Sequence, residues 1–187
     1  STSALTSGGG LGYGGMSAPM FAVEFDTYNN QGQEGADDHI ALMKDGSSTE
    51  HSNFGTTLAA VANLEDGNWR NFRFSYRAPS GANPAKISVE VDLDRDGDFG
   101  DTGEVVFDNV TADLETLFGG SSEKIYWGFT AATGGSTNLQ KVQIDRISST
   151  SRANAEPEIS VATASPIAVP AGSPPQTGGL PPEARRA

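Results

Sequence analysis

Hydrophobic and polar side chains alternate along several short stretches of the chain. The first apolar set is Phe21, Val23 and Phe25. A β-strand sends successive side chains to opposite faces, so these three residues share one face. Two later stretches repeat the pattern, with aromatic or β-branched residues at every second position: Phe72, Phe74, Tyr76, Ile87, Val89 and Val91. Gly, Asn, Asp and Ser fill the intervening segments, as is typical of turns. The pattern predicts an all-β domain.

Three further elements are expected in the second half of this domain. The stretch KIYWGFTAAT (124–133) is largely apolar and predicts a more deeply buried strand. The stretch LQKVQIDRIS (139–148) predicts the last strand. Between these and the earlier strands, ADLETLFGG (112–120) predicts one short helix with Gly119 or Gly120 as its C-terminal cap.

The composition changes near residue 152. From Ala153 onward the chain holds seven of its ten prolines, with Ala, Ser and Gly between them. Such a segment buries too little apolar surface to offset the entropy lost on ordering the chain. We therefore expect one domain over residues 1–152 and a linker or disordered tail over residues 153–187. The stretch EPEISVATASP (156–166) leaves an alternative open, the first strand of a further immunoglobulin-like module.

The charge and the amino-acid composition narrow the class of protein. The 187 residues carry a net charge of −12 and include no cysteine, so no disulfide framework is possible. The negative charge argues against nucleic acid and against an anionic membrane surface as partners. No stretch is long and apolar enough to insert in a membrane. This balance is typical of a secreted protein or of one that collects cations.

One strand carries the first candidate for chemistry. Glu24 and Asp26 alternate with the apolar set of residues 21–25 and therefore share the opposite face. Two neighbouring carboxylates repel each other unless a cation lies between them. With Asn30 and His39 they offer hard oxygen ligands and one imidazole, a set that suits calcium or manganese. The alternative is a strand end with solvated acids.

Two structures are compatible with the glycine-rich opening, STSALTSGGGLGYGGMS (1–17). It is either a flexible leader or a shaped loop in which the backbone closely approaches a ligand.

The stretch VEFDTYNN…HIAL (23–42) resembles the metal-binding strand and loop of legume-type (L-type) lectins, whose pattern is E-x-D-x-Y-x-N, then an acid, then H-I-x-I. Three further pieces resemble motifs of this family in the family's order: SGGGLGYGG, LEDGNWRNFRFSY and IYWGFTAATGG. The similarity covers residues 7–148, and the sequence resembles the bacterial secreted members of the family. It implies a concanavalin-like jelly-roll sandwich of two antiparallel sheets that binds carbohydrate with Ca²⁺ and Mn²⁺ or a similar transition metal.

The resemblance also implies roles for individual residues. Glu24, Asp26 and His39 would hold the transition metal, and Asp26, Asn30 and the carbonyl of Tyr28 would hold calcium. The family's remaining acid falls on Glu34, five residues before the histidine, and Asp37 or Asp38 could replace it. Sugar contacts would come from the glycine loop, the metal loop and the loop after the last motif: Gly9, Gly10, Tyr28, Asn30, Gly134, Gly135, Ser136 and Thr137. Tyr28 or Tyr13 could stack on a sugar ring.

The chain also departs from the family pattern. An aspartate upstream of the glycine loop, which accepts hydrogen bonds from sugar in the family, is not in this sequence, and neither are the family's N-terminal strands. The sequence therefore corresponds to the C-terminal two-thirds of a lectin domain, for which we expect weak or undetectable monosaccharide binding.

A second acidic cluster spans DLDRDGDFGDTGE (92–104). Asp92, Asp94 and Asp96 followed by Gly97 match the start of an EF-hand loop. The closing glutamate is twelfth in such loops, whereas Glu104 is thirteenth here. The six acids that would form a structural calcium site are Asp92, Asp94, Asp96, Asp98, Asp101 and Glu104. The alternative is a solvated hairpin tip between two strands.

Catalysis finds little support in the sequence. Glycoside hydrolases of this architecture use E-x-D-x-x-E, and the position of their second glutamate is Asn29 here. We interpret His51 as a surface turn residue. The leading hypothesis is thus a non-enzymatic, metal-dependent lectin module of an extracellular or cell-surface bacterial protein, with glycans or polysaccharide as partners. The alternative is a structural or adhesive calcium-stabilised module without sugar binding. The sugar and the oligomeric state stay open.

Overall fold

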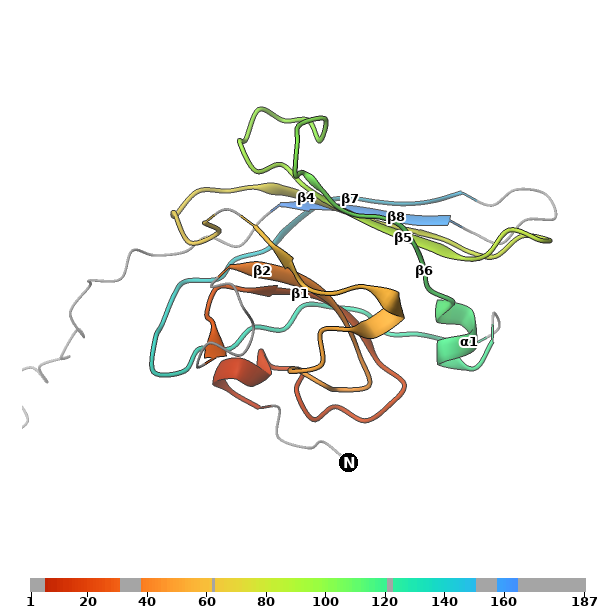
Figure 1. Cartoon of the computed structure of the whole chain (residues 1–187), viewed down its shortest axis with the longest axis horizontal. Coiled ribbons are helices and arrows are strands. Elements are labelled where there is room, and N and C mark those ends of the chain that lie inside the picture. Colours follow the sequence, from red (N-terminus) through yellow and green to blue (C-terminus); the bar gives the residue numbers. More distant parts are fainter. Residues whose placement is uncertain (1–5, 31–37, 62, 121–122, 151–157, 165–187) are drawn as a thin grey trace, which may run out of the picture.

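The computed structural model describes residues 6–30, 38–61, 63–120, 123–150 and 158–164. Its strands form two antiparallel sheets, as Figure 1 shows. The smaller sheet has the order β1 (Phe21–Asp26), β2 (His39–Lys44), β3 (Ala59–Ala60). The larger has the order β6 (Val105–Thr111), β5 (Lys86–Val91), β4 (Asn71–Arg77), β8 (Glu158–Ala164), β7 (Gln143–Thr150). The helical elements are α1 (Leu114–Phe118) and the 3-10 turns η1 (Gly8–Gly10) and η3 (Asn53–Gly55). The expected all-β class is confirmed.

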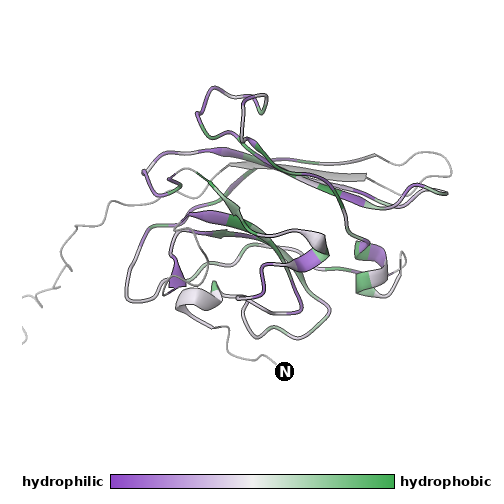
Figure 2. Ribbon diagram, viewed as in Figure 1, coloured by the Kyte–Doolittle hydropathy of each residue, from purple (hydrophilic) through white to green (hydrophobic). Residues whose placement is uncertain are grey.

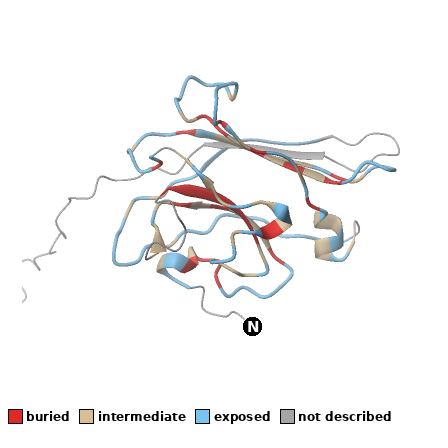
Figure 3. Ribbon diagram, in the orientation of Figure 1, coloured by how far each residue is buried: buried red, intermediate tan, exposed pale blue. Residues whose placement is uncertain are grey.

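The main hydrophobic core lies between the two sheets. Phe25 of β1 meets Phe72 of β4 edge to face, with ring centroids 4.9 Å apart. Ile40 and Leu42 of β2 are buried in the same cluster as the alternate residues of β5 (Ile87, Val89 and Val91). In Figure 3 the buried residues are concentrated in β2 and along the facing strands. The apolar faces expected from the alternation are therefore the faces that pack together.

The outer face of β1 and β2 is covered by the glycine-rich N-terminal segment. Tyr13 and Met20 pack there against Ala41 and Met43 of β2 in a second, smaller core. Because Glu24, Asp26 and His39 alternate with the residues of the main core, they point toward this second layer. Within the opening, residues 7–15 thus form a shaped loop, one of the two possibilities that the sequence left open, and residues 1–5 lie outside the described residues.

The short helix forms where it was expected. Asp113 caps the N-terminus of α1 by accepting a hydrogen bond from the backbone N–H of Thr116. Gly119 ends the helix with φ of 94°, a left-handed conformation that glycine adopts without strain.

The expectation of a buried strand over residues 124–133 was wrong. This segment pairs with no strand in the described part of the chain, and its residues are exposed apart from the partly buried Ala132, with Tyr126 exposed to 97%. Apolar composition predicts burial, but a strand also needs a neighbouring edge to pair its backbone groups. The last expected strand does form, as β7, although its Ile144 and Ile147 are exposed.

Strand β8 lies within the range 153–187 that was assigned to a linker or tail. It pairs with β4 on one side, Val161 opposite Phe74, and with β7 on the other, Val161 opposite Ile147. The larger sheet therefore includes residues 158–164, beyond residue 152. Residues 153–157 and 165–187 lie outside the described residues.

Candidate metal and ligand site

Three side chains from separate segments converge on the outer face of the smaller sheet. Glu24 comes from β1, His39 from β2, and His51 from the segment that precedes η3. Nε2 of His51 lies 3.2 Å from Oε1 of Glu24, and Nε2 of His39 lies 3.5 Å from the same oxygen. The two imidazole rings meet edge to face, with centroids 5.2 Å apart. One carboxylate oxygen thus faces both imidazole nitrogens.

The strand register and the glycine-rich segment hold this cluster in place. β1 and β2 are antiparallel with Asp26 opposite His39, so Glu24 lies diagonally across from the histidine. Both Glu24 and His39 are almost completely buried. The hydroxyl of Tyr13 donates a hydrogen bond to Oε2 of Glu24. This bond leaves Oε1 directed at the two histidines.

This arrangement has the chemistry of a transition-metal site. The ligand atoms of Glu24, His39 and His51 all lie within 4.8 Å of one another. Imidazole nitrogen and carboxylate oxygen are common ligands of zinc, iron and manganese ions. A buried carboxylate is costly without a cationic partner, whether that partner is a metal ion or a protonated histidine. The residues present therefore fit a divalent transition metal.

His51 is a functional candidate that the sequence analysis missed. It was expected in a surface turn, but its side chain is only 11% exposed and contacts Glu24. The available signal was compositional, because His39 and His51 are the two histidines of the chain. The family resemblance gave His51 no role, so spacing alone could not select it.

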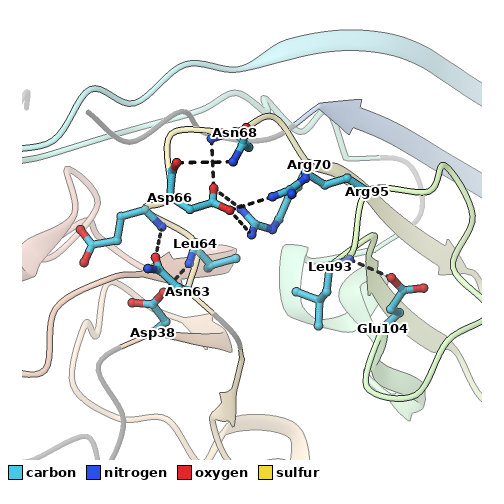
Figure 4. Close-up of polar contacts among 10 residues, drawn as sticks. Asp38, Asn63, Leu64, Asp66, Asn68, Arg70, Leu93, Arg95 and Glu104 are labelled. Atoms are coloured by element: carbon cyan, nitrogen blue, oxygen red, sulfur yellow. Dashed lines mark hydrogen bonds and ion pairs between the residues drawn. The ribbon is translucent and has the colours of Figure 1, made fainter. Parts of the chain in front are cut away.

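The other expected metal ligands take different positions. Asp26 is buried, and its Oδ1 accepts a hydrogen bond of 2.9 Å from the backbone N–H of Tyr28. The carboxylate of Asp38 accepts a hydrogen bond from the backbone N–H of Leu64, as Figure 4 shows. Tyr28 presents an exposed side chain. Glu34 and Asp37 lie outside the described residues.

The residues expected to contact sugar come from three segments, and the structure brings these segments together. Gly9 lies against the Asn30 side chain so closely that an added Cβ would be 2.9 Å from Oδ1. The backbone N–H of Gly8 donates to the carbonyl of Thr133 at 3.2 Å. A Cβ on Gly134 would lie 3.3 Å from Cα of Gly8, so glycine on both sides permits the approach.

Two side-chain hydrogen bonds hold the third segment to the other two. Thr130 Oγ1 donates to the carbonyl of Leu11 at 3.0 Å, and Asn138 Nδ2 donates to Thr27 Oγ1 at 3.2 Å. The loop between these anchors is exposed to solvent at Gly134, Gly135, Ser136 and Thr137. Gly10 differs from the other candidates, because it is buried and a Cβ there would collide with Thr6. Gly10 therefore shapes the loop from within.

The second acidic cluster forms the connection between β5 and β6. Its first and last acids, Asp92 and Glu104, are both 1% exposed, whereas the acids between them are exposed. Carboxylate oxygens of the loop lie within 4.8 Å of one another in three overlapping groups. The neighbouring charges, Asp94 first and then Asp96, raise the pKa of the Asp101 carboxyl above its ordinary value. The six acids are thus gathered in space as well as in sequence.

The comparisons with known proteins leave the family open. The sequence matches no protein-family model, and no solved structure matches the chain. Among the described residues, no helix has the length and apolar character needed to cross a membrane.

Proposed function

We propose that this chain is a metal-dependent carbohydrate-binding module of the L-type lectin kind, with a concanavalin-like jelly-roll architecture. The resemblance over residues 7–148 suggests the class. The two facing antiparallel sheets and the position of the metal strand are compatible with it. The module binds glycans without hydrolysing them and belongs to a secreted or cell-surface bacterial protein.

The observation that carries the proposal is the convergence of three distant segments at one exposed place. The glycine loop reaches Asn30 through Gly9 and reaches the loop after Thr133 through Gly8. Carbohydrate sites are built from a few convergent polar groups on loops that a rigid scaffold positions. An amide such as that of Asn30 can accept through oxygen and donate through nitrogen, as a sugar hydroxyl requires.

Metal ions would fix the positions of the three segments that form the proposed sugar site. A transition metal, Mn²⁺ or a similar ion, would be held by Glu24, His39 and His51, with Asp26 opposite His39 in the ladder. Calcium would be held by Asp26, Asn30 and the carbonyl of Tyr28. The metals supply rigidity and charge, and the protein supplies the groups that contact sugar. The side-chain amide of Asn30 would then donate an N–H to a sugar hydroxyl, beside the exposed backbone of the glycine loop.

A glycan array tests the proposal directly. The wild-type chain is applied with Ca²⁺ and Mn²⁺, and again after EDTA treatment, beside Asn30→Ala and the matched control Asn83→Ala. Asn83 is an exposed residue in the turn between β4 and β5. We expect weak, EDTA-sensitive binding by wild type and Asn83→Ala, because the family's aspartate acceptor is not in this sequence. Loss of the Asn30 hydrogen bonds leaves sugar hydroxyls unpaired, which costs about 1–3 kcal/mol, and should weaken binding roughly fivefold to a hundredfold.

Two outcomes would contradict this function. Binding that survives EDTA, or that is equal in Asn30→Ala and Asn83→Ala, would remove Asn30 and the metals from recognition. Absence of glycan binding, combined with a lower melting temperature in EDTA, would favour the structural or adhesive module instead. The buried Glu24–His39–His51 cluster gives that alternative its own physical basis, because a metal bound there links two strands and a loop.

A further inference from the structure

The loop from Asp92 to Glu104 has features that a solvated hairpin tip does not need. Figure 1 shows it projecting from the larger sheet, and Figure 2 colours it mainly as hydrophilic. It nevertheless begins and ends in carboxylates that are almost completely buried, Asp92 and Glu104. Burying an ionised carboxylate is costly unless a cation or several donors compensate it. The two buried carboxylates therefore require donors or a cation that can be identified in the structure.

The Asp92 carboxylate is only half compensated by protein. Its Oδ2 accepts hydrogen bonds from Asn71 Nδ2 at 3.0 Å and from the backbone N–H of Gly97 at 3.1 Å. Its Oδ1 is buried and has no hydrogen-bond donor. A carboxylate oxygen of Asp92 lies within 4.8 Å of oxygens from Asp94 and Asp96. A buried oxygen without a donor beside two further carboxylates points to a missing positive charge.

No basic side chain of the described residues supplies that charge. The single basic residue of the loop, Arg95, turns away and binds Asp66, with Nη1 2.8 Å from Oδ2 (Figure 4). Arg73, the other nearby cation, pairs with Glu90 and lies over the ring of Phe99. Within the described part of the chain, no ion pair reaches the six loop carboxylates.

The closing glutamate reaches the cluster although the loop has one residue more than an EF-hand loop. A turn over residues 101–104 returns the chain, with Gly103 at φ of 94° and the N–H of Glu104 donating to the carbonyl of Asp101. The carboxylate of Glu104 then lies beside those of Asp94 and Asp101. It also accepts from the backbone N–H of Leu93 at 2.8 Å, which fixes it across the base of the loop (Figure 4).

We propose that the loop from Asp92 to Glu104 binds one Ca²⁺ ion through its clustered carboxylates, with Asp92 and Glu104 as the buried anchors at its two ends. All candidate ligands are hard oxygens, and their number suits the six to eight ligands that calcium takes. The ion joins the end of β5 to the start of β6, which are also bonded through the N–H of Val91 and the carbonyl of Glu104 at 2.8 Å. It is independent of the carbohydrate site and does not require that site to function.

Thermal melting of the full chain tests the proposal with calcium chloride as the probe. Asp94→Asn with Asp96→Asn removes two charges and keeps the side-chain oxygens that accept backbone N–H groups. Asp108→Asn with Asp145→Asn removes two exposed charges elsewhere in the larger sheet and is the matched control. In EDTA, the loop variant should melt at or above the wild-type temperature, because repulsion is relieved. In the presence of calcium, the wild-type chain should instead melt at a higher temperature than the loop variant.

The expected size of the calcium effect follows from ligand linkage. A hundredfold excess of calcium over Kd should raise the melting temperature by roughly 5–10 °C for a chain of this size. The part of this increase that comes from calcium in the loop should be mostly lost in Asp94→Asn/Asp96→Asn. The control variant should show the same increase in melting temperature as the wild-type chain. An unchanged calcium shift in the loop variant, or an equal loss in both variants, would overturn the proposal.

A second measurement separates this loop from any calcium bound near Asp26. Phe99→Trp places an indole within the loop, next to the carboxylates. Tb³⁺, which replaces Ca²⁺ at oxygen sites, should then emit on indole excitation more strongly than with the wild-type chain. The added emission should disappear with Asp94→Asn/Asp96→Asn and on competition with calcium. Emission that is insensitive to both would show that the loop holds no ion, whatever the carbohydrate site does.

Discussion

Nε2 of His51 lies 3.2 Å from Oε1 of Glu24, although 27 positions separate the two residues along the chain. The contact brings a histidine from a loop onto the buried carboxylate of β1, beside His39 of β2. A site with one carboxylate and two imidazoles favours transition metals over calcium, because nitrogen ligands suit the softer ions. The first prediction tests this ligand set.

His51→Ala should weaken transition-metal binding by roughly tenfold or more, since even the outer partners of metal ligands contribute tenfold to a hundredfold. Calcium binding should change little, because the ligands proposed for calcium, Asp26, Asn30 and the carbonyl of Tyr28, do not include His51. Titration calorimetry with Zn²⁺, Mn²⁺ and Ca²⁺ measures the three affinities separately. Equal Zn²⁺ and Mn²⁺ affinities in wild type and His51→Ala would leave the histidine as a hydrogen-bond partner of Glu24 only.

The second prediction separates Glu24 from Asp26. If Asp26 serves both ions, Asp26→Ala should abolish transition-metal binding and calcium binding near Asp26, leaving only the calcium held by the loop from Asp92 to Glu104. It should also lower the melting temperature, because metal binding is linked to folding. Glu24→Ala should abolish only the transition metal and keep most of the calcium affinity. The same calorimetric titrations distinguish the two variants. The titrations are made in the Asp94→Asn/Asp96→Asn background, so that the loop does not contribute. Unchanged calcium affinity after Asp26→Ala in that background would remove Asp26 from the calcium site.

Parts of this arrangement could be predicted from the sequence because they depend on strand periodicity. The alternation of Phe21, Val23 and Phe25 with Glu24 and Asp26 fixed which residues enter the main core and which face the second layer. The acids of residues 92–104 were similarly recognisable, because a loop between two paired strands has little freedom to disperse them.

Other parts depend on contacts that no local pattern encodes. His51 reaches Glu24 through the path of the segment between β2 and η3, which the spacing of residues does not determine. The segment 124–133 has the composition of a buried strand, but strand formation also depends on an available partner edge. The position of β8 between β4 and β7 likewise depends on pairing with these two distant strands, which the residues of β8 alone do not reveal.

The third prediction concerns the main core. Ile87 and Ile147 both belong to the larger sheet, but Ile87 is fully buried and Ile147 is 48% exposed. Ile87→Ala should lower the free energy of unfolding by about 2–5 kcal/mol, because it leaves a cavity in the packed layer. Ile147→Ala should change it by no more than about 0.5 kcal/mol. Urea denaturation monitored by circular dichroism measures both, and similar losses would contradict the packing described for β5.

The fourth prediction concerns acid stability. Asp66 accepts a bidentate pair of hydrogen bonds from the buried Arg70, at 2.9 and 2.8 Å, and a further bond from Arg95 (Figure 4). Hydrogen bonding to Arg70 is the main reason that the pKa of the Asp66 carboxyl is held well below its ordinary value of 3.8. A depressed folded-state pKa stabilises the protein above the unfolded-state pKa, and this stabilisation is lost as the pH falls.

The free energy of unfolding should therefore decrease as the pH is lowered through about 4 and below, in part because Asp66 takes up a proton on unfolding. Asp66→Asn should be less stable at neutral pH, where Arg70 loses its charged partner, and should show a shallower decrease in acid. Asp108→Asn, at an exposed position on β6, should keep the wild-type slope. Urea denaturation at a series of pH values gives the slopes. Parallel slopes for wild type and Asp66→Asn would show that this ion pair does not contribute to acid unfolding.

The last prediction concerns the exposed apolar residues of segment 124–133. Trp127 and Phe129 are two positions apart, and their rings meet edge to face with centroids 6.2 Å apart on the surface. Neighbouring exposed apolar side chains of this kind promote association and bind hydrophobic dyes. We expect the wild-type chain to bind an anilinonaphthalene dye and to associate as its concentration rises, and Trp127→Gln should reduce both. Dye fluorescence and sedimentation velocity measure the two effects. Trp69→Gln removes the other tryptophan, which is 40% exposed, and is the matched control because Trp69 lies in a different segment, directly before β4. If both variants reduce association equally, the effect follows from loss of any surface tryptophan and not from the exposed row that Trp127 and Phe129 form.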